Sequence, residues 1–321
     1  MTDPCALSPE PCPLTIGSRG SQLALWQANH IADQLRARGH KISIEIIRTS
    51  GDAMQHLSFA QVGASVPKGM FTKEIEEALA DGRIDLAVHS LKDLPTTLDD
   101  SLAIAAIPPR ADARDAFVSI DHESFAALPP GSRIGTSSLR RQAQLRAVRS
   151  DLHYREFRGN VDTRLRKMSE GEADAIILAS AGLERLGRIE YLRERFPALV
   201  LCPAAGQGAL AIETRAGDTT TVEALAVLDH ADTRFAVTAE RTALAALGGG
   251  CQVPIGIYCE PSGEGFTITG VVASVDGKSS VRAALDHQKG LSPTALGQKL
   301  AERLLKQGAG RLLESATLPT D

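Results

Sequence analysis

The feature that most constrains the fold is a strand–turn–helix unit that occurs twice in similar form. IGSRGSQLALWQA begins at Ile16, and IGTSSLRRQAQLRA begins at Ile134. Each stretch is typical of a strand end, a short turn of Gly, Ser and Arg, and an amphipathic helix. A helix-to-strand stretch, DGRIDLAVHS, likewise resembles EGEADAIILAS further along the chain. This internal similarity predicts two α/β lobes of related construction.

Strand-like and helix-like runs alternate around these units. Strands are predicted at 14–19, 41–48, 85–90 and 101–107, and helices at 21–39 and 71–83. The spacing in the first helix places Leu23, Trp26, Ile31 and Leu35 near one side. The pattern changes after about Asp218, where a helix, three strands and a closing helix (294–308) follow. That order predicts a third, smaller α+β domain with an antiparallel sheet, which contains Cys251.

Composition excludes several classes of protein. The chain has 321 residues, 43% of them apolar, which is enough for two or three domains. A net charge of −4 argues against a dedicated nucleic-acid binder, and no apolar run is long enough to span a bilayer. The first residues do not resemble a signal peptide. Five cysteines without a CxxC pair favour the reducing cytoplasm.

Positive charge is concentrated in one segment of this acidic chain. Ten basic and three acidic residues lie between Arg133 and Lys167. Arg140 and Arg141 fall at a predicted helix N-terminus, as does RGNVDTR (158–164). Cations at that end oppose the helix dipole, whereas its exposed N–H groups favour an anion. The placement predicts an anionic ligand, and the alternative is an ordinary solvated basic face.

The stretch VHSLKDLP (88–95) ends a predicted strand with polar residues and a proline. We expect Ser90, Lys92 and Asp93 to lie on a loop at the carboxyl edge of the sheet, where open α/β sheets bind ligands. A carboxylate there could stabilise a developing cation or move a proton. The alternative is a surface Lys–Asp pair of little energetic value.

Cys251 follows three glycines in LGGGCQVPIG. Glycines permit unusual backbone conformations and leave room beside the sulfur, and a thiolate can be a nucleophile or a covalent tether. The alternative is a buried structural cysteine. The chain contains no serine-hydrolase elbow, HExxH zinc site, P-loop or GxGxxG. We therefore predict no metal.

Taken together, nine stretches in order along the chain resemble the porphobilinogen deaminase (hydroxymethylbilane synthase) family. They are SRGSQLALWQ, RTSGD, KGMFTKEIE, DLAVHSLKDLP, GTSSLRRQAQL, RGNVDTRL, DAIILASAGLERLG, PAAGQGALAIE and LGGGCQVPIG. The first dozen residues, with Cys5 and Cys12, lie outside the resemblance, and no function is assigned to them.

The resemblance implies two lobes like type II periplasmic binding proteins and a smaller C-terminal α+β domain. Domain 1 would be discontinuous (1–110 and 203–228), domain 2 would span 111–202, and domain 3 would span 229–321 and carry Cys251. A cytoplasmic monomer without nucleic-acid or membrane partners is implied as well.

The resemblance also implies an activity. Family members join four porphobilinogen molecules head to tail, release ammonia, and produce the linear tetrapyrrole hydroxymethylbilane of haem biosynthesis. The chain grows on a dipyrromethane cofactor held by a thioether, here at Cys251, and Gly248–Gly250 would leave room for its first ring. Asp93 would stabilise the cation that forms when porphobilinogen loses ammonia.

Two carboxylates per ring give the longest bound chain about twelve negative charges, which must be neutralised by nearby cations. The family positions that bind these carboxylates correspond to Arg19, Ser21, Ser90, Lys92, Ser138, Arg140, Arg141, Arg158 and Arg164. Lys68 and Phe71 would belong to an active-site loop. Two other classes stay open: a solute-binding protein, and a transferase that uses Cys251 as a nucleophile.

Overall fold

The computed structural model of the chain describes residues 13–50, 72–249, 253–287 and 290–317. The chain divides into two compact units. Unit 1 comprises Met1–His89, Leu98–Pro109 and Leu210–His230, and unit 2 comprises Ser90–Thr97, Arg110–Ala209 and Ala231–Asp321. The predicted boundaries of three domains stay a prediction.

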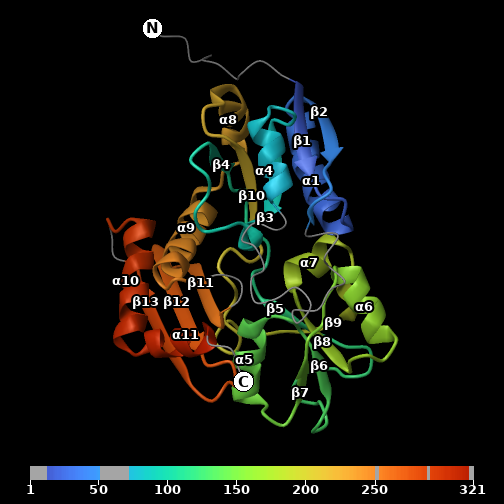
Figure 1. Ribbon diagram of the computed structural model, residues 1–321, viewed down its shortest axis with the longest axis vertical. Coiled ribbons are helices and arrows are strands. Elements are labelled where there is room, and N and C mark those ends of the chain that lie inside the picture. The colour runs from blue at the N-terminus through green and yellow to red at the C-terminus, as the bar shows by residue number, and fades with distance from the viewer. Residues whose placement is uncertain (1–12, 51–71, 250–252, 288–289, 318–321) are drawn as a thin grey trace. The chain divides into compact units, whose positions relative to one another are not determined.

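Unit 1 is built on a five-stranded sheet with the order β2-β1-β3-β10-β4. Its elements are β1 (Pro13–Ser18), α1 (Gln22–Arg36), β2 (Lys41–Ile46), α4 (Lys73–Ala80), β3 (Leu86–Ser90), β4 (Leu102–Ala106), β10 (Leu210–Arg215) and α8 (Thr219–Leu225), with a 3-10 turn, η3 (Ala226–Leu228). β1 pairs in parallel with β2 and β3, and β10 is antiparallel to β4. In Figure 1, α1 lies alongside β1 and β2, and these three elements are in contact. The predicted strands and helices of this region are confirmed.

The buried face of α1 differs from the predicted one at Trp26. Ile31 and Leu35 are fully buried as expected, together with Ala28. Trp26 is 36% exposed and stacks on His30, with ring centroids 4.9 Å apart. Trp26 lies about 200° around the helix from Ala28, because each residue advances about 100°. The small Ala28 therefore takes the core position that the sequence pattern gave to the large tryptophan.

Unit 2 contains a second five-stranded sheet with the order β7-β6-β8-β5-β9. Its elements are β5 (Asp115–Val118), β6 (Arg133–Gly135), α5 (Leu139–Val148), β7 (His153–Arg155), α6 (Val161–Ser169), β8 (Ala175–Ala179), α7 (Ser180–Arg185), η2 (Ile189–Tyr191) and β9 (Leu192–Arg195). β6 is parallel to β7 and β8, and β5 is antiparallel to β8 and β9. Four strands of each sheet follow one another in the sequence, β1–β4 in unit 1 and β6–β9 in unit 2. Between the third and fourth of these lies one strand from elsewhere in the chain, β10 or β5, which is antiparallel to a neighbour. The predicted relation between the two lobes is therefore visible in their strand order.

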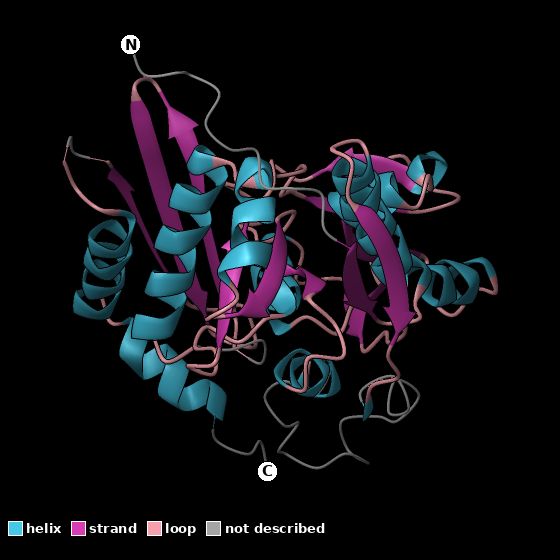
Figure 2. Ribbon diagram, turned by 90° about the horizontal axis from the view of Figure 1, so that it is seen from above, coloured by secondary structure: helices cyan, strands magenta, loops and turns pink. Residues whose placement is uncertain are grey.

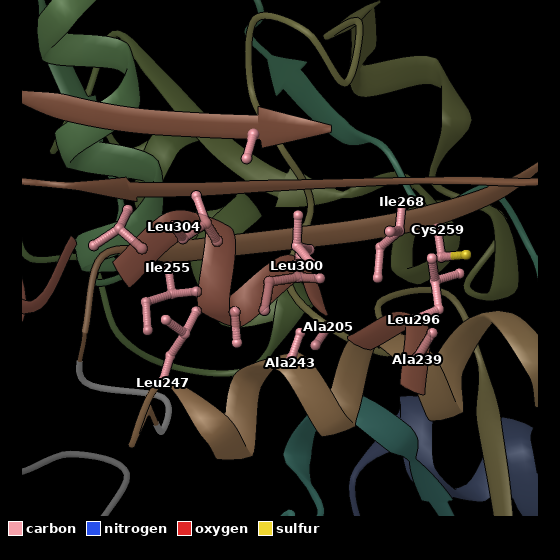
Figure 3. Close-up of a cluster of buried hydrophobic side chains, with 14 of the residues drawn as sticks. Ala205, Ala239, Ala243, Leu247, Ile255, Cys259, Ile268, Leu296, Leu300 and Leu304 are labelled. Atoms are coloured by element: carbon pink, nitrogen blue, oxygen red, sulfur yellow. The ribbon is translucent and has the colours of Figure 1, made fainter. Parts of the chain in front are cut away.

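The remainder of unit 2 is a three-stranded antiparallel sheet with helices packed against it. Its elements are α9 (Ala231–Ala246), β11 (Ile255–Ser262), β12 (Gly265–Ala273), β13 (Ser280–Asp286), α10 (Pro293–Lys306) and α11 (Ala309–Thr317). Figure 3 shows the core of this part, where Leu300 and Leu304 of α10 lie near Ile255 and Ile268 of the sheet. The antiparallel sheet is confirmed, but α10 does not close the described chain, because α11 follows it.

Helices pack against the strands of each of the three sheets (Figure 2). The predicted class, two α/β lobes with a smaller C-terminal α+β domain, is confirmed. Among the described residues, no helix is both long and apolar enough to cross a membrane. The same residues contain no group of three or more His, Cys, Asp or Glu side chains placed to hold a metal.

Candidate active site

Asp93 stands on a short turn directly after β3. The strand ends at Ser90 and is followed by a 3-10 turn, η1 (Leu91–Asp93), closed by a hydrogen bond from Leu94 N to Leu91 O at 3.2 Å. Leu91 and Leu94 are buried and anchor the turn, whereas Lys92 is half-buried and Asp93 is exposed. The predicted polar loop at the carboxyl end of the strand is confirmed.

Two arginines in the first turn of α5 are buried against one carboxylate. Ser138 caps the helix, and its Oγ accepts a hydrogen bond from Arg141 N at 3.4 Å. Arg140 Nη1 lies 2.6 Å from Oδ2 of the fully buried Asp115, and Arg141 Nη2 lies 2.8 Å from its Oδ1. Burial alone would raise the pKa of Asp115, but the charges of Arg140 and Arg141 hold it well below its usual range.

Asp115 does not use all the hydrogen-bonding capacity of these arginines. Arg140 also donates to Cys202 O, and Arg141 to Ile177 O. A guanidinium carries five N–H groups. Each arginine makes three hydrogen bonds, so two N–H groups on each have no partner in the part of the chain that the structure describes. Both side chains therefore remain able to bind a further anion.

Arg158 and Arg164 flank the start of α6, as the sequence predicted. Arg158 pairs with the carboxylate of Glu156. The Nε of Arg164 is shielded from solvent and has no hydrogen-bond partner within the described ranges. Burial lowers the pKa of Arg164 to about 10, and the charges of Arg141 and Arg158 act in the same direction. A buried donor without an acceptor is costly, and this one suits an anionic ligand.

Lys92 and Asp93 belong to the same electrostatic neighbourhood. The pKa of Lys92 is lowered to about 8, mainly by burial. The charges of Arg141 and Arg140 contribute to this lowering, while Asp93 and Asp115 oppose it. Asp93 also acts on Arg164. The group as a whole has four cationic side chains and two carboxylates, namely Arg140, Arg141, Arg164, Lys92, Asp93 and Asp115. This surplus of positive charge next to Asp93 can hold a ligand with several carboxylates.

Among the described residues, two of the predicted site residues, Arg19 and Ser21, lie in unit 1. Arg19 follows β1 and is half-buried. Ser21 is the N-cap of α1, where its Oγ accepts a hydrogen bond from Ala24 N at 3.3 Å. A capping hydroxyl can still donate its own hydrogen. Ser21 and Ser138 therefore have the same structural task in their two lobes, whatever they bind.

Three predicted residues, Lys68, Phe71 and Cys251, lie outside the described residues. Two of the glycines that precede Cys251 are explained by the fold. Gly248 has a φ of +66° just after α9, a conformation that favours glycine at the end of a helix. A Cβ on Gly249 would lie 2.5 Å from Ile255 Cδ1 and 2.8 Å from Leu244 Cδ1. Close packing and helix termination thus require glycine at both positions.

Asp115 and Gln207 belong to the site but were not among the predicted residues. Gln207 is fully buried, and its Nε2 donates to Ala113 O at 2.7 Å and to Asp115 Oδ1 at 2.9 Å. Its Oε1 has no partner in the described part of the chain. The signal for Asp115 was a lone acid at the start of the apolar run AFV, because an acid in such a place needs a cationic partner.

Comparison with known proteins relates these residues to one family. The profile "Porphobilinogen deaminase, dipyromethane cofactor binding domain" matches residues 14–223, and "Porphobilinogen deaminase, C-terminal domain" matches residues 234–306. The porphobilinogen deaminase of Trichlorobacter lovleyi is 50% identical over 305 residues, which cover 94% of this chain and 96% of that protein. That of Syntrophotalea carbinolica is 50% identical over 302 residues, covering 94% and 95%.

Among solved structures, a putative methionine-binding lipoprotein from Bacillus subtilis aligns with a TM-score of 0.42 and 13% identity. The alignment covers 69% of this chain and 92% of that one. The two family profiles together span both α/β sheets and most of the C-terminal part. The chain therefore belongs to the porphobilinogen deaminase family.

Proposed function

We propose that this protein is a hydroxymethylbilane synthase, which joins four porphobilinogen molecules head to tail with release of ammonia. Asp93, exposed on its turn beside a surplus of positive charge, is the observation that carries the proposal. The cations bind the carboxylates of the substrate, and the exposed carboxylate of Asp93 is left to act on the reacting rings. A solute-binding protein would need the cations but would have no use for Asp93.

The residues present suit a dipyrromethane cofactor. Within the described residues, the Nε of Arg164 and two N–H groups on each of Arg140 and Arg141 have no partner, and acetate and propionate groups would satisfy these donors. Lys92, Arg158 and Ser138 in unit 2 complete the proposed set, with Ser90 beside them in the sequence. In unit 1 we assign Arg19 and Ser21 to the same task. When bound, the cofactor supplies the pyrrole α-carbon to which the first substrate unit is joined.

Asp93 acts in the reaction through its negative charge. Positive charge develops on porphobilinogen as ammonia leaves, and a fixed carboxylate nearby stabilises that charge. The same carboxylate can accept hydrogen bonds from pyrrole N–H groups and so orient the ring. Lys92 and Arg164 hold the substrate carboxylates close to Asp93, which keeps the reacting carbons in place.

Cys251 is the proposed site of covalent attachment, and Lys68 and Phe71 are assigned to a loop over the site. We further propose the division into domains 1–110 with 203–228, 111–202 and 229–321. A cytoplasmic monomer that acts without nucleic acid agrees with the net charge of −4 and the five cysteines.

The proposal is tested with the purified full chain and porphobilinogen. We expect release of ammonia and of a linear tetrapyrrole, and an intact mass above the encoded mass by about two pyrrole units. Cys251→Ser should lack the added mass. Asp93→Asn should retain it and lose turnover by about 100-fold or more, the scale of a lost transition-state interaction. A chain that leaves porphobilinogen unchanged is not this enzyme, and an adduct that persists in Cys251→Ser moves the attachment elsewhere.

A further inference from the structure

Two consecutive residues of α9, Glu240 and Arg241, contact the segments that hold the Asp93 loop, defined here as residues 90–95. Glu240 is fully buried, whereas Arg241 is half-buried. Neither residue belongs to the cationic group around Asp93. Arg241 nevertheless bonds the backbone directly after Asp93, and Glu240 holds the turn on which the backbone before Asp93 rests.

Glu240 supports the loop from its N-terminal side. Its carboxylate accepts hydrogen bonds from Gly206 N at 2.7 Å and from Arg110 Nη1 at 2.7 Å. Gly206 has a φ of +73°, and a Cβ there would lie 3.2 Å from Lys92 N. Leu91 N donates to the carbonyl oxygen of Ala209, at the end of the same turn, at 3.0 Å. The 206–209 turn, held by Glu240, is thus the surface on which residues 91 and 92 rest.

Arg241 holds the other side of the loop. Its Nη1 donates to Leu94 O at 3.2 Å, and its Nη2 donates to Pro95 O at 2.5 Å. These are the two carbonyl groups that follow Asp93. Proline at 95 has no N–H with which to fix the chain by a backbone hydrogen bond. The guanidinium therefore supplies a fixed point at Pro95, where the chain has no N–H of its own to bond.

The position of α9 in the chain gives these contacts a consequence for the reaction. Arg241 precedes Cys251 by ten residues, and α9 is the helix that leads toward it. One helix thus connects the loop that carries Asp93 with the segment proposed to carry the cofactor. A displacement of the reacting groups by about 1 Å can cost roughly 100-fold in rate.

We propose that Arg241 is a positioning residue for Asp93, which fixes the carboxylate relative to α9 through Leu94 O and Pro95 O. The proposal rests on the proposed function, because it assumes that Asp93 acts on porphobilinogen. The role proposed for Arg241 is exerted through Asp93 and does not require a contact with substrate or cofactor. Its removal should lower kcat and leave the KM for porphobilinogen nearly unchanged.

The test measures kcat and KM of the holoenzyme for Arg241→Met and Arg241→Lys, each in wild-type and Asp93→Glu backgrounds. Asp93→Glu keeps the carboxylate but moves it by one methylene group, so exact placement is already lost. We expect Arg241→Met to lower kcat about 10- to 100-fold in the wild type and less than about threefold in Asp93→Glu. Arg241→Lys, which can reach one carbonyl, should show a smaller loss with the same dependence on background. Arg303→Met is the matched control, because Arg303 also donates to a backbone carbonyl, Ala284 O, and should keep kcat within about twofold.

Intact mass shows whether each variant carries the cofactor, independently of turnover. If Arg241→Met does not fold, the pair of Arg241→Lys variants carries the test alone. Equal losses in the two backgrounds, or an unchanged kcat, would overturn the positioning role. A wild-type chain that does not consume porphobilinogen would instead overturn the proposed function, so the two failures are distinguishable.

Discussion

The two α/β lobes share a strand order, and in each the inserted strand carries a buried acid. The partners of that acid differ between the lobes. Glu213 on β10 lies 3.1 Å from His89 Nε2, and both side chains are buried. Asp115 on β5 instead meets two arginines. Glu213 thus faces one imidazole ring, whereas Asp115 faces two guanidinium groups, which stay charged in proteins. The buried carboxylate in unit 2 is therefore outnumbered by permanent cations, and the one in unit 1 is not.

The difference shows how the protein can place cations at a helix N-terminus. Neither α1 nor α5 has an acid in its first turn, so the dipole of α5 opposes Arg140 and Arg141 without local compensation. Asp115 supplies that compensation from a neighbouring strand. One carboxylate is shared by two guanidinium groups, which leaves net positive charge for a ligand.

The largest expected effect comes from replacing the two buried acids, Asp115 and Glu213, and comparing the losses in stability. Asp115→Asn leaves Arg140 and Arg141 buried without a counter-charge, and we expect a loss of about 3–5 kcal/mol in the free energy of unfolding. Glu213→Gln keeps a hydrogen-bonding partner for His89 and should cost about 1 kcal/mol or less. Urea denaturation of both variants measures the difference. Equal losses in the free energy of unfolding would mean that Arg140 and Arg141 do not depend on Asp115 as a counter-charge.

A second variant should separate Arg164 from the arginines that have a buried partner. Arg164→Leu removes a shielded guanidinium whose Nε has no acceptor in the described part of the chain, so the free energy of unfolding should stay level or rise by about 1 kcal/mol. Arg141→Leu, in contrast, breaks the pairing with Asp115 and should lower it. Both changes should raise the KM for porphobilinogen, by about tenfold for one lost charged contact. A clear loss of stability in Arg164→Leu would contradict the view that this side chain is kept for a ligand.

The sequence predicted the parts of the site that depend on local pattern. Ser90, Lys92 and Asp93 were placed correctly because a strand pattern ends in polar residues and a proline. The helix starts at Ser138 and Arg158–Arg164 followed from capping and turn residues. Trp26 was misplaced because periodicity locates a stripe only to within about one residue, and core volume then decides which residue takes it.

The long-range partners could not be predicted. Asp115 meets Arg140 and Arg141 across 25 and 26 residues of sequence, and Glu240 meets Arg110 across 130. An acid at the start of an apolar run can signal burial, as at Asp115, but nothing in the local pattern says which base will meet it. Such pairs follow from the way strands and helices pack, which is a property of the whole fold.

Lys92 gives the cationic group a signature that depends on pH. Burial lowers its pKa from 10.5 to about 8, so between these values the unfolded chain binds more protons than the folded one. Stability should therefore rise with pH in that window, because the burial penalty disappears as Lys92 loses its charge. The KM for porphobilinogen should rise over the same range. Lys92→Arg should flatten both profiles, and unchanged profiles in that variant would assign the titration to another group.

The smallest expected effect concerns the helix N-caps, which are alike in the two lobes. Ser21 and Ser138 cap equivalent helices with similar geometry, at 3.3 and 3.4 Å from the capped N–H group. Replacing either with alanine should cost about 1 kcal/mol, the usual value of an N-cap, and the two losses should match within experimental error. Thermal unfolding at one pH measures both. Because α5 must also hold Arg140 and Arg141 against its dipole, a clearly larger loss in Ser138→Ala would show that the cap and the arginines are coupled, and that Asp115 does not compensate the charge alone.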